Sequence, residues 1–175
     1  MKPEKGLRSW RRTSEEGNPT IKVTIEIDAP IIKVIDVITD PKFRSTYDNS
    51  FLREFMAQRI EEHTYLAYML TKKVSIVASR FFVLICHWHC TEDGTLYTPC
   101  ISVDRDDLAP YDPSLVKGHT PISGNKIVPL SSTKTEHTYL SEVNFGGYVP
   151  NFLLTNEFKS QTSYLLRIQE LVKQV

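Results

Sequence analysis

The sequence predicts an α+β fold in which a curved antiparallel β-sheet wraps around one long C-terminal helix. Residues 20–27 alternate apolar and polar side chains, which is the period of a half-buried strand. Further strand candidates follow in pairs separated by a few polar residues, which favours antiparallel neighbours. From Pro150 onward the apolar spacing becomes helical. Because one such sheet has a large apolar face and a single long helix to cover it, strong curvature around the helix is the economical arrangement.

Local signals justify each element in turn. Asp28 is expected to cap a short helix that has Pro30 in its first turn. In "EDG", Gly94 supplies the positive φ of a hairpin turn, and Pro150 fits the first turn of the last helix. Residues 105–115 form a loop rich in proline and aspartate. The expected strands lie at about 20–27, 51–61, 64–71, 80–91, 95–104, 122–130 and 135–145, a turn or short helix at 40–50, and the long helix at 150–174.

Length and composition are those of one globular domain spanning residues 1–175. A chain of 175 residues buries roughly 70% of its unfolded surface, which is enough for a sizeable core. Lys+Arg and Asp+Glu both number 21, so the formal net charge is zero. That balance argues against a nucleic-acid partner and against strong attraction to anionic membranes, while a transient membrane contact stays open.

The sequence predicts a cytoplasmic protein. The N-terminal residues carry charge without an apolar run, unlike a signal peptide, and the apolar stretch Phe81–Cys86 has only the length of a strand. Three cysteines, an odd number, indicate free thiols in a reducing compartment. The sequence contains no GxSxG, P-loop, GxGxxG or HExxH motif, so we expect no enzymatic activity.

Four segments, in order, resemble the START family, the StAR-related lipid-transfer domains of helix-grip (Bet v 1-like) fold. They are "YDNS" from Tyr47, "SRFFVL" from Ser79, "LVKGHTPISGNKIVPL" from Leu115 and "STKTEHTYLSEVNFGGYVPNFLLTN" from Ser132. The resemblance runs from about residue 6 to the C-terminus. It implies a single lipid (a phospholipid, a sterol or another hydrophobic ligand) bound in an internal cavity and transferred between membranes. It also implies a monomer without a cofactor other than the lipid.

The chain departs from the family pattern at several places. Phe81 replaces the aspartate usual after the arginine, and the asparagine of the lid helix falls one place late, at Asn156. The family's usual opening helix is not evident, so we expect either a short natural version or a truncated piece of the domain. The acidic and basic positions of sterol-binding members fall on Ala67 and Cys86, which argues against sterol binding through a buried charged pair.

Alternation along the strands, counted from Arg80, predicts the side chains that line the cavity. Apolar walls with a few hydroxyl groups suit a long acyl or polycyclic ligand, although the same side chains could instead fill a solid core. The predicted lining residues are Tyr65, Ala67, Met69, Arg80, Phe82, Leu84, Cys86, Trp88, Tyr97, Pro99, Ile101, Val103, Tyr139, Ser141, Val143, Leu154, Phe158, Gln161 and Leu165.

Two segments are predicted to form a gate. The hinge contains Gly146, Gly147, Tyr148 and Pro150, a pattern that is also ordinary punctuation between a strand and a helix. The loop at 105–115, with Pro110 and Tyr111, is the position at which the resemblance places the family's mobile loop.

Other hypotheses remain open at this point. His87 and His89 in "CHWHC" lie on one face of a strand and could hold a metal in a β-sheet enzyme, if a third ligand exists. Arg80 could pair with a lipid phosphate or form a structural ion pair. Cys86 lies opposite Cys100 if the "EDG" turn is a three-residue loop. A START-like scaffold without a ligand is a further alternative. Four aromatic residues could form a cage for a quaternary ammonium group: Trp88, Tyr97, Tyr139 and Tyr148.

Overall fold

The computed structural model describes residues 6–73, 77–109 and 112–175, and for Asp106 and residues 151–159 it describes the backbone alone. The helices are α1 (Ile31–Thr39), α2 (Pro41–Tyr47) and α3 (Asn151–Val172), with a short 3-10 helix η1 (Asp106–Leu108). The strands are β1 (Arg8–Thr13), β2 (Pro19–Ile27), β3 (Phe51–Arg59), β4 (Thr64–Thr71), β5 (Arg80–His87), β6 (His89–Cys90), β7 (Leu96–Ser102), β8 (Val116–Lys117), β9 (His119–Ser131) and β10 (Lys134–Asn144).

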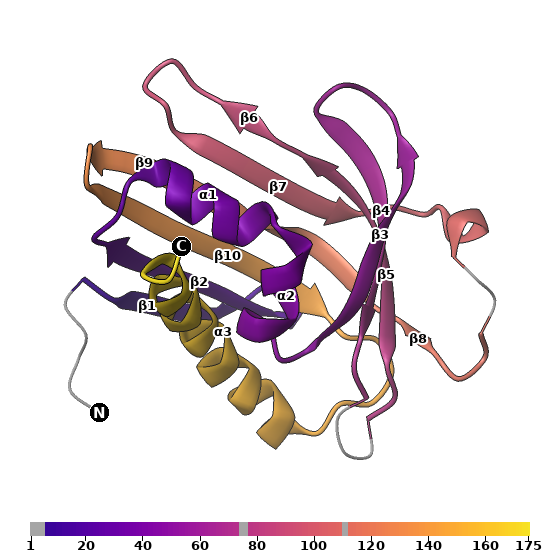
Figure 1. The fold of residues 1–175 in the computed structure, drawn as a ribbon. Helices are drawn as coiled ribbons and strands as arrows, with labels where there is room; N and C mark the ends of the chain where they lie inside the picture. The colour runs from indigo at the N-terminus through magenta and orange to yellow at the C-terminus, as the bar shows by residue number, and fades with distance from the viewer. Residues whose placement is uncertain (1–5, 74–76, 110–111) are drawn as a thin grey trace.

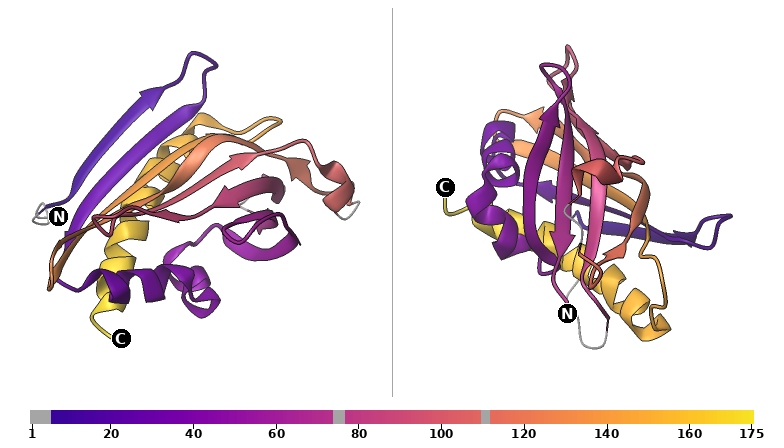
Figure 2. Two further views of the ribbon diagram at one scale, coloured as in Figure 1. Left: turned by 90° about the horizontal axis from the view of Figure 1, so that it is seen from above. Right: turned by 90° about the vertical axis from the view of Figure 1, so that its right-hand side faces the viewer.

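One antiparallel sheet, in the order β1-β2-β10-β9-β7-β5-β4-β3, curves around α3 (Figures 1 and 2). The short strands lie off this path: β6 pairs with β7, and β8 pairs in parallel with β5. Helices α1 and α2 lie beside the C-terminal end of α3 on the same side of the sheet (Figure 1). The predicted fold class is therefore confirmed.

The main core lies where β2, β9 and β10 face α1 and the C-terminal half of α3. The predicted apolar face of β2 is correct, since its four isoleucine and valine side chains are at most 4% exposed. Leu165 and Ile168 of α3 and Val34 and Val37 of α1 are completely buried against it. The apolar faces of α1 and α3, spaced at the helical period, thus pack against the apolar face of β2, spaced at the strand period, in one cluster.

Several local predictions are corrected. Asp28 does not cap α1, whose N-cap is Pro30 without a side-chain hydrogen bond; the Asp28 carboxylate lies 3.6 Å from Lys134 Nζ instead. Asp40 caps α2 by accepting a hydrogen bond from the backbone N–H of Lys42. Strands β1 and β8 were not predicted, because β1 is exposed along its whole length and β8 is two residues long. A strand without a buried face does not alternate apolar and polar residues, and two residues are too few to show an alternation.

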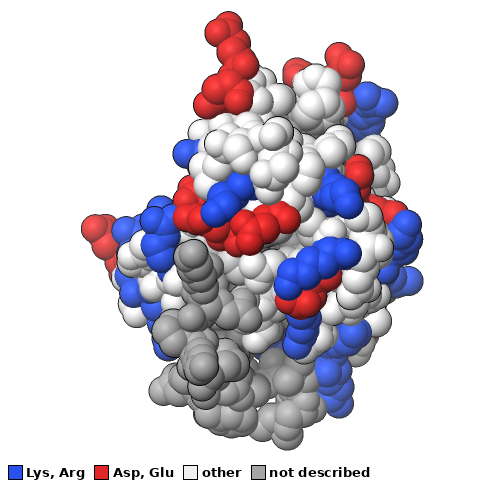
Figure 3. Space-filling model, turned by 60° about the vertical axis from the view of Figure 1, so that its left-hand side comes forward, with Lys and Arg blue, Asp and Glu red and all other residues white. Residues whose placement is uncertain are grey.

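Charges of both signs are interspersed on the face of the molecule seen in Figure 3. This distribution agrees with the zero formal net charge of the sequence. None of the helices in the described part of the chain is long and apolar enough to cross a membrane.

Candidate ligand-binding site

The inner faces of β4 and β5, the faces turned toward α3, form an apolar cluster of their own. Ala67 lies opposite Leu84, and both are at most 5% exposed. The other members are the buried Phe82 and Cys86, with Tyr65, Met69, Cys100 and Val143 packed against them. Seven predicted lining residues are thus brought together here, and this cluster is separate from the main core among the described residues.

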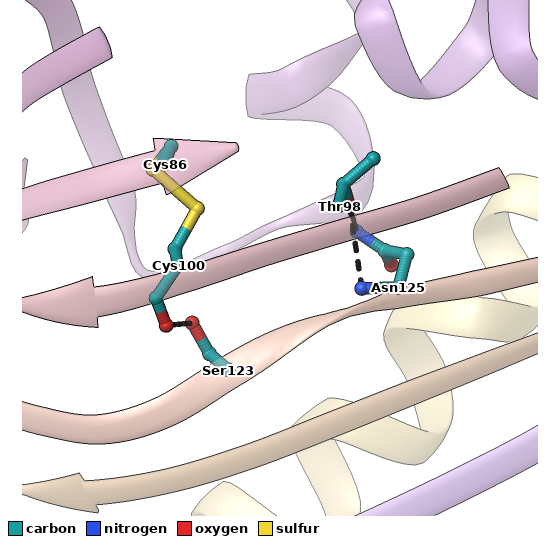
Figure 4. Close-up of a disulfide and its surroundings, with 5 residues drawn as sticks. All are labelled: Cys86, Thr98, Cys100, Ser123 and Asn125. Atoms are coloured by element: carbon teal, nitrogen blue, oxygen red, sulfur yellow. Dashed lines mark hydrogen bonds between the residues drawn. A yellow bond between two sulfur atoms is a disulfide. The ribbon is translucent and has the colours of Figure 1, made fainter. Parts of the chain in front are cut away.

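Cys86 and Cys100 are directly opposite each other on β5 and β7 and are joined by a disulfide (Figure 4). Their Cα atoms lie 4.2 Å apart, the close spacing of a non-hydrogen-bonded antiparallel pair. The prediction that all cysteines are free is therefore wrong for this pair and holds for the exposed Cys90. The register that the three-residue "EDG" loop would produce is confirmed.

That register also corrects the predicted inner face of β7. Because Cys100 faces the interior with Cys86, the residues on either side of it must face outward. Tyr97, Pro99 and Ile101 are accordingly exposed. Val103 packs on the outer face of the sheet, in a cluster with Tyr68, Leu70 and Val83 that includes Leu108, Ala109 and Leu115 of the following loop.

The proposed aromatic cage is not assembled. Trp88 follows the end of β5, is 41% exposed and contacts His63 in a tilted arrangement, with 3.7 Å between ring centroids. Tyr148 is 83% exposed at the hinge, and Tyr97 lies on the outer face. Of the four aromatics, Tyr139 alone faces the interior, where its ring lies 5.1 Å from that of Tyr164. The four side chains therefore do not surround a common point.

Arg80 is buried, at 4% exposed, but serves the hinge rather than the wall of the site. Its Nε donates to the carbonyl oxygen of Phe145 at 3.1 Å, and its Nη2 to that of Gly146 at 3.2 Å. Its Nη1 donates to the carbonyl oxygen of Ala78. The proposals that Arg80 binds a lipid phosphate or a carboxylate are not supported by these contacts, since each nitrogen already has a backbone acceptor.

The other predicted residues divide between described and undescribed parts. Ser141 is buried on the inner face of β10, Gln161 is half-buried, and Leu165 belongs to the main core. Gly146 and Gly147 have φ of +61° and +58°, a left-handed backbone conformation that favours glycine, and Pro150 is the N-cap of α3. Pro110, Tyr111 and the side chains of Leu154 and Phe158 lie outside the described residues.

A guanidinium group that sequence reasoning missed, that of Arg44, lies in the last turn of α2. Arg44 donates from Nη2 to Asp48 Oδ2 at 3.3 Å, and its Cζ lies 5.3 Å from the centroid of the Phe51 ring. Its side chain is 28% exposed, yet its Nε is buried without a hydrogen-bond partner. Burial would lower the pKa of Arg44, but Tyr164, Tyr47 and Asp48 raise it above its ordinary value, so the group stays cationic. The i,i+4 spacing of Arg44 and Asp48 around a tyrosine was the available signal.

A polar network on the inner faces of β7, β9 and β10 was also missed. Asn125 Nδ2 donates to Thr98 Oγ1 at 3.0 Å (Figure 4), so Asn125 Oδ1 is free to accept from His137 Nε2 at 2.9 Å. His137 is completely buried, and burial lowers its pKa to about 3. Its neutral ring therefore belongs to the structural core, next to the surface that Thr98 and Asn125 present.

The hypothesis of a metal site on His87 and His89 gains no third ligand from the fold. The two rings stack with centroids 6.5 Å apart, and His87 Nδ1 lies 2.9 Å from Thr64 Oγ1. Within residues 6–73, 77–109 and 112–175, no group of three or more His, Cys, Asp or Glu side chains is placed to hold a metal ion.

Comparisons with known proteins agree on one family. A profile of the START domain matches residues 5–170. Human StAR-related lipid transfer protein 5 superposes with a TM-score of 0.87 at 22% identity, over 99% of this chain and 85% of its own. Human STARD10 gives 0.85 at 17% identity, over 99% and 72%. A STAR-related lipid transfer protein from Xanthomonas axonopodis gives 0.74 at 17% identity, over 99% and 97%. A search of curated proteins finds no match. The chain belongs to the START domain family.

Proposed function

We propose that this domain binds one lipid between the inner face of the sheet and α3, and carries it between membranes. The family membership and the names of the similar human and bacterial proteins support lipid binding and transfer in general. The observation that carries the proposal for this chain is the division of its interior into two apolar clusters. Between them, inner-face residues such as Thr98, Ser123 and Asn125 stay half-buried although they face the interior. A solid core would bury them completely.

The proposed function is the transport of a lipid without a chemical reaction. Moving a chain of about 16 methylenes from a bilayer into water costs about 13 kcal/mol, at roughly 0.8 kcal/mol per CH₂ group. An apolar wall built from β4 and β5 offsets that cost during transit. Residues such as Phe82 and Leu84 supply this wall. No covalent chemistry is required, and we propose that the domain is not an enzyme and needs no cofactor beyond the lipid.

Arg44 narrows the class of lipid. A half-buried cation whose buried Nε has no hydrogen-bond partner is suited to an acidic head group, a phosphate or a carboxylate. Sterols lack such a group, and Ala67 and Cys86, the latter in a disulfide, offer no charged pair for them. We therefore propose an amphipathic lipid with an anionic group, oriented with that group at Arg44 and its apolar chain along β4 and β5.

Mass spectrometry of the organic extract from purified protein tests lipid binding directly. We expect about one phosphate- or carboxylate-bearing lipid per protein molecule. Fluorescent phospholipid should also transfer between donor and acceptor vesicles when the protein is added. An extract without lipid, together with no transfer, would leave only a scaffold that binds other partners.

Substitution of Arg44 tests the orientation. Arg44→Gln should weaken binding of an anionic lipid at least about tenfold, because a charge-assisted hydrogen bond contributes about 1.5–3 kcal/mol. Lys42→Gln, on the exposed side of the same helix, is the matched control and should bind as the wild type does. Equal affinities of the Arg44→Gln variant and the wild type, measured by lipid titration, would overturn the head-group assignment.

We further propose that the domain works as a monomer in the cytoplasm, where the paired Cys86 and Cys100 would be kept reduced, and that it contacts membranes transiently and binds no nucleic acid. The balanced charges visible in Figure 3 support a weak, reversible membrane contact rather than stable anchoring. Sedimentation of the lipid-free protein and co-sedimentation with vesicles measure the two states.

A further inference from the structure

Cys86 and Cys100 lie in the middle of a row of side chains that crosses the inner face of the sheet. Strand register places one residue from each of β4, β5, β7, β9 and β10 in this row: Tyr65, Cys86, Cys100, Ser123 and Ser141. Cys86 belongs to the buried cluster under β4 and β5, and Cys100 packs at the border of that cluster. The two sulfur atoms therefore lie where the apolar wall of the proposed lipid site meets its hydroxyl-bearing side.

The cysteine pair also lies beside a break in the pairing of the sheet. Three residue pairs join β5 to β7, against five between β7 and β9 and seven between β4 and β5. Continued pairing would place His87 opposite Pro99 as the next hydrogen-bonded pair, but Pro99 has no N–H to donate. Pairing resumes only at His89 of β6, which lies opposite Tyr97. The disulfide therefore joins the two strands covalently at the edge of this break.

We propose that Cys86 and Cys100 are a site of reversible oxidation in the folded protein, with two thiols in a reducing cytoplasm and a disulfide under peroxide. The disulfide clamps β5 to β7 beside the break, and in the dithiol form the break can widen. The clamp does not depend on the proposed function. Its effect on the lipid rests on that function, since widening at this row loosens the wall along which the lipid lies and speeds lipid exchange.

The two thiols differ in their access to an oxidant. Cys86 is 3% exposed, whereas Cys100 is half-buried and faces the interior, so a small oxidant such as hydrogen peroxide reaches Cys100 first. Its thiolate attacks one peroxide oxygen and breaks the O–O bond, which gives a sulfenic acid and releases hydroxide. The Cys86 thiolate then attacks the Cys100 sulfur and displaces a second hydroxide. The two thiol protons convert both hydroxides to water, so two thiols and one peroxide give one disulfide and two waters.

Counting thiols tests the site on the full chain, with Cys90→Ala to remove the exposed free cysteine. The reduced protein is freed of reductant, treated with hydrogen peroxide and then with reduced glutathione, and its thiols are alkylated in denaturant and counted by mass spectrometry. We expect two thiols before peroxide, none after it and two again after glutathione, while near-ultraviolet circular dichroism stays that of a folded chain. Thiols that survive peroxide, or a disulfide that glutathione opens only in unfolded protein, would overturn the proposal.

Hydrogen–deuterium exchange compares the disulfide and dithiol forms of the same chain without any ligand. Opening the bond should speed exchange several-fold more at Ile85 and Ile101, the pair next to the cysteines, than at Val23 of the main core. The reason is that a widened break exposes the first two amides locally, whereas the Val23 amide exchanges only when the core opens. An equal factor at all three amides would mean that the bond acts through overall stability alone and would overturn the clamp.

Lipid exchange is the last readout, and its failure is distinguishable from failure of the redox site. The disulfide form should transfer fluorescent phospholipid between vesicles several-fold more slowly than the dithiol form. Cys86→Ser/Cys100→Ser should transfer at a rate that peroxide does not change, and Cys100→Ser alone is a second variant in case the double variant does not fold. Equal rates of the two forms would overturn the effect on exchange. A chain that passes the thiol and amide tests but carries no lipid would contradict the proposed function and support the redox site.

Discussion

The two halves of the interior are built differently. Where α1 and the C-terminal half of α3 cover β2, β9 and β10, side chains such as Val23, Ile127 and Ile168 are completely buried. Under β4 and β5 the buried apolar cluster is small, and Tyr65, Met69 and Val143 at its border are half-buried. The sheet reflects the same division, since β2 pairs with β10 over eight residue pairs, whereas β5 pairs with β7 over three.

This difference indicates how one sheet can serve two purposes. Close packing in the first half supplies the free energy that keeps the chain folded. Incomplete packing in the second half leaves a surface that a ligand can cover. The disulfide between Cys86 and Cys100 crosses the short β5–β7 ladder and so joins the two halves covalently. Three experiments test this contrast between the two halves.

The largest expected effect comes from truncating one apolar side chain in each half. Ile168→Ala, in the main core, should lower the free energy of unfolding by about 2–5 kcal/mol, because it leaves a cavity. Leu84→Ala should cost less than about 2 kcal/mol, since it belongs to the small cluster whose bordering residues, such as Tyr65 and Met69, are only half-buried. Urea-induced unfolding of the lipid-free proteins measures both, and equal losses would mean that the two halves are packed alike.

Removing the disulfide should be next in size. Cys86 and Cys100 are 14 residues apart, and a closed loop of that length restricts the unfolded chain by about 3 kcal/mol. The double variant Cys86→Ala/Cys100→Ala should therefore unfold at lower urea concentration under non-reducing conditions. Cys90→Ala, at the exposed free cysteine, is the control and should match the wild type. An unchanged midpoint in the double variant would argue that the bond does not stabilise the junction.

The smallest expected effect is a pH dependence from the buried His137 of the main core. Its pKa is about 3 when folded and 6.5 ordinarily, so between these values the unfolded chain binds a proton that the folded protein does not. Stability should therefore fall as the pH drops below about 6.5, by about 2 kcal/mol between pH 7 and pH 5. In His137→Gln this loss should be absent, while His119→Gln, at an exposed histidine, should retain it. Urea-induced unfolding of the wild type and both variants at the two pH values measures these differences in stability.

Prediction from the sequence succeeded where the burial of a side chain follows from the spacing of apolar residues along its own helix or strand. The faces of β2 and of the C-terminal half of α3 are as predicted, and so is the cluster around Ala67 and Leu84. It failed on β7, where Tyr97 and Ile101 face outward, because the inner face of a strand depends on its register with a distant partner. The missed Arg44 has the same origin: its neighbours Phe51 and Tyr164 come from other elements.

The fold class, the main core, the glycines before α3 and the START motifs could be predicted from the sequence alone, since these depend on spacing and composition along a continuous stretch. The pairing of two cysteines, the backbone acceptors of Arg80 and the surroundings of Arg44 follow only from the three-dimensional fold. Each of these depends on the distance between residues far apart in the chain. Such distances are set by strand register and by the curvature of the sheet around α3, which no local pattern encodes.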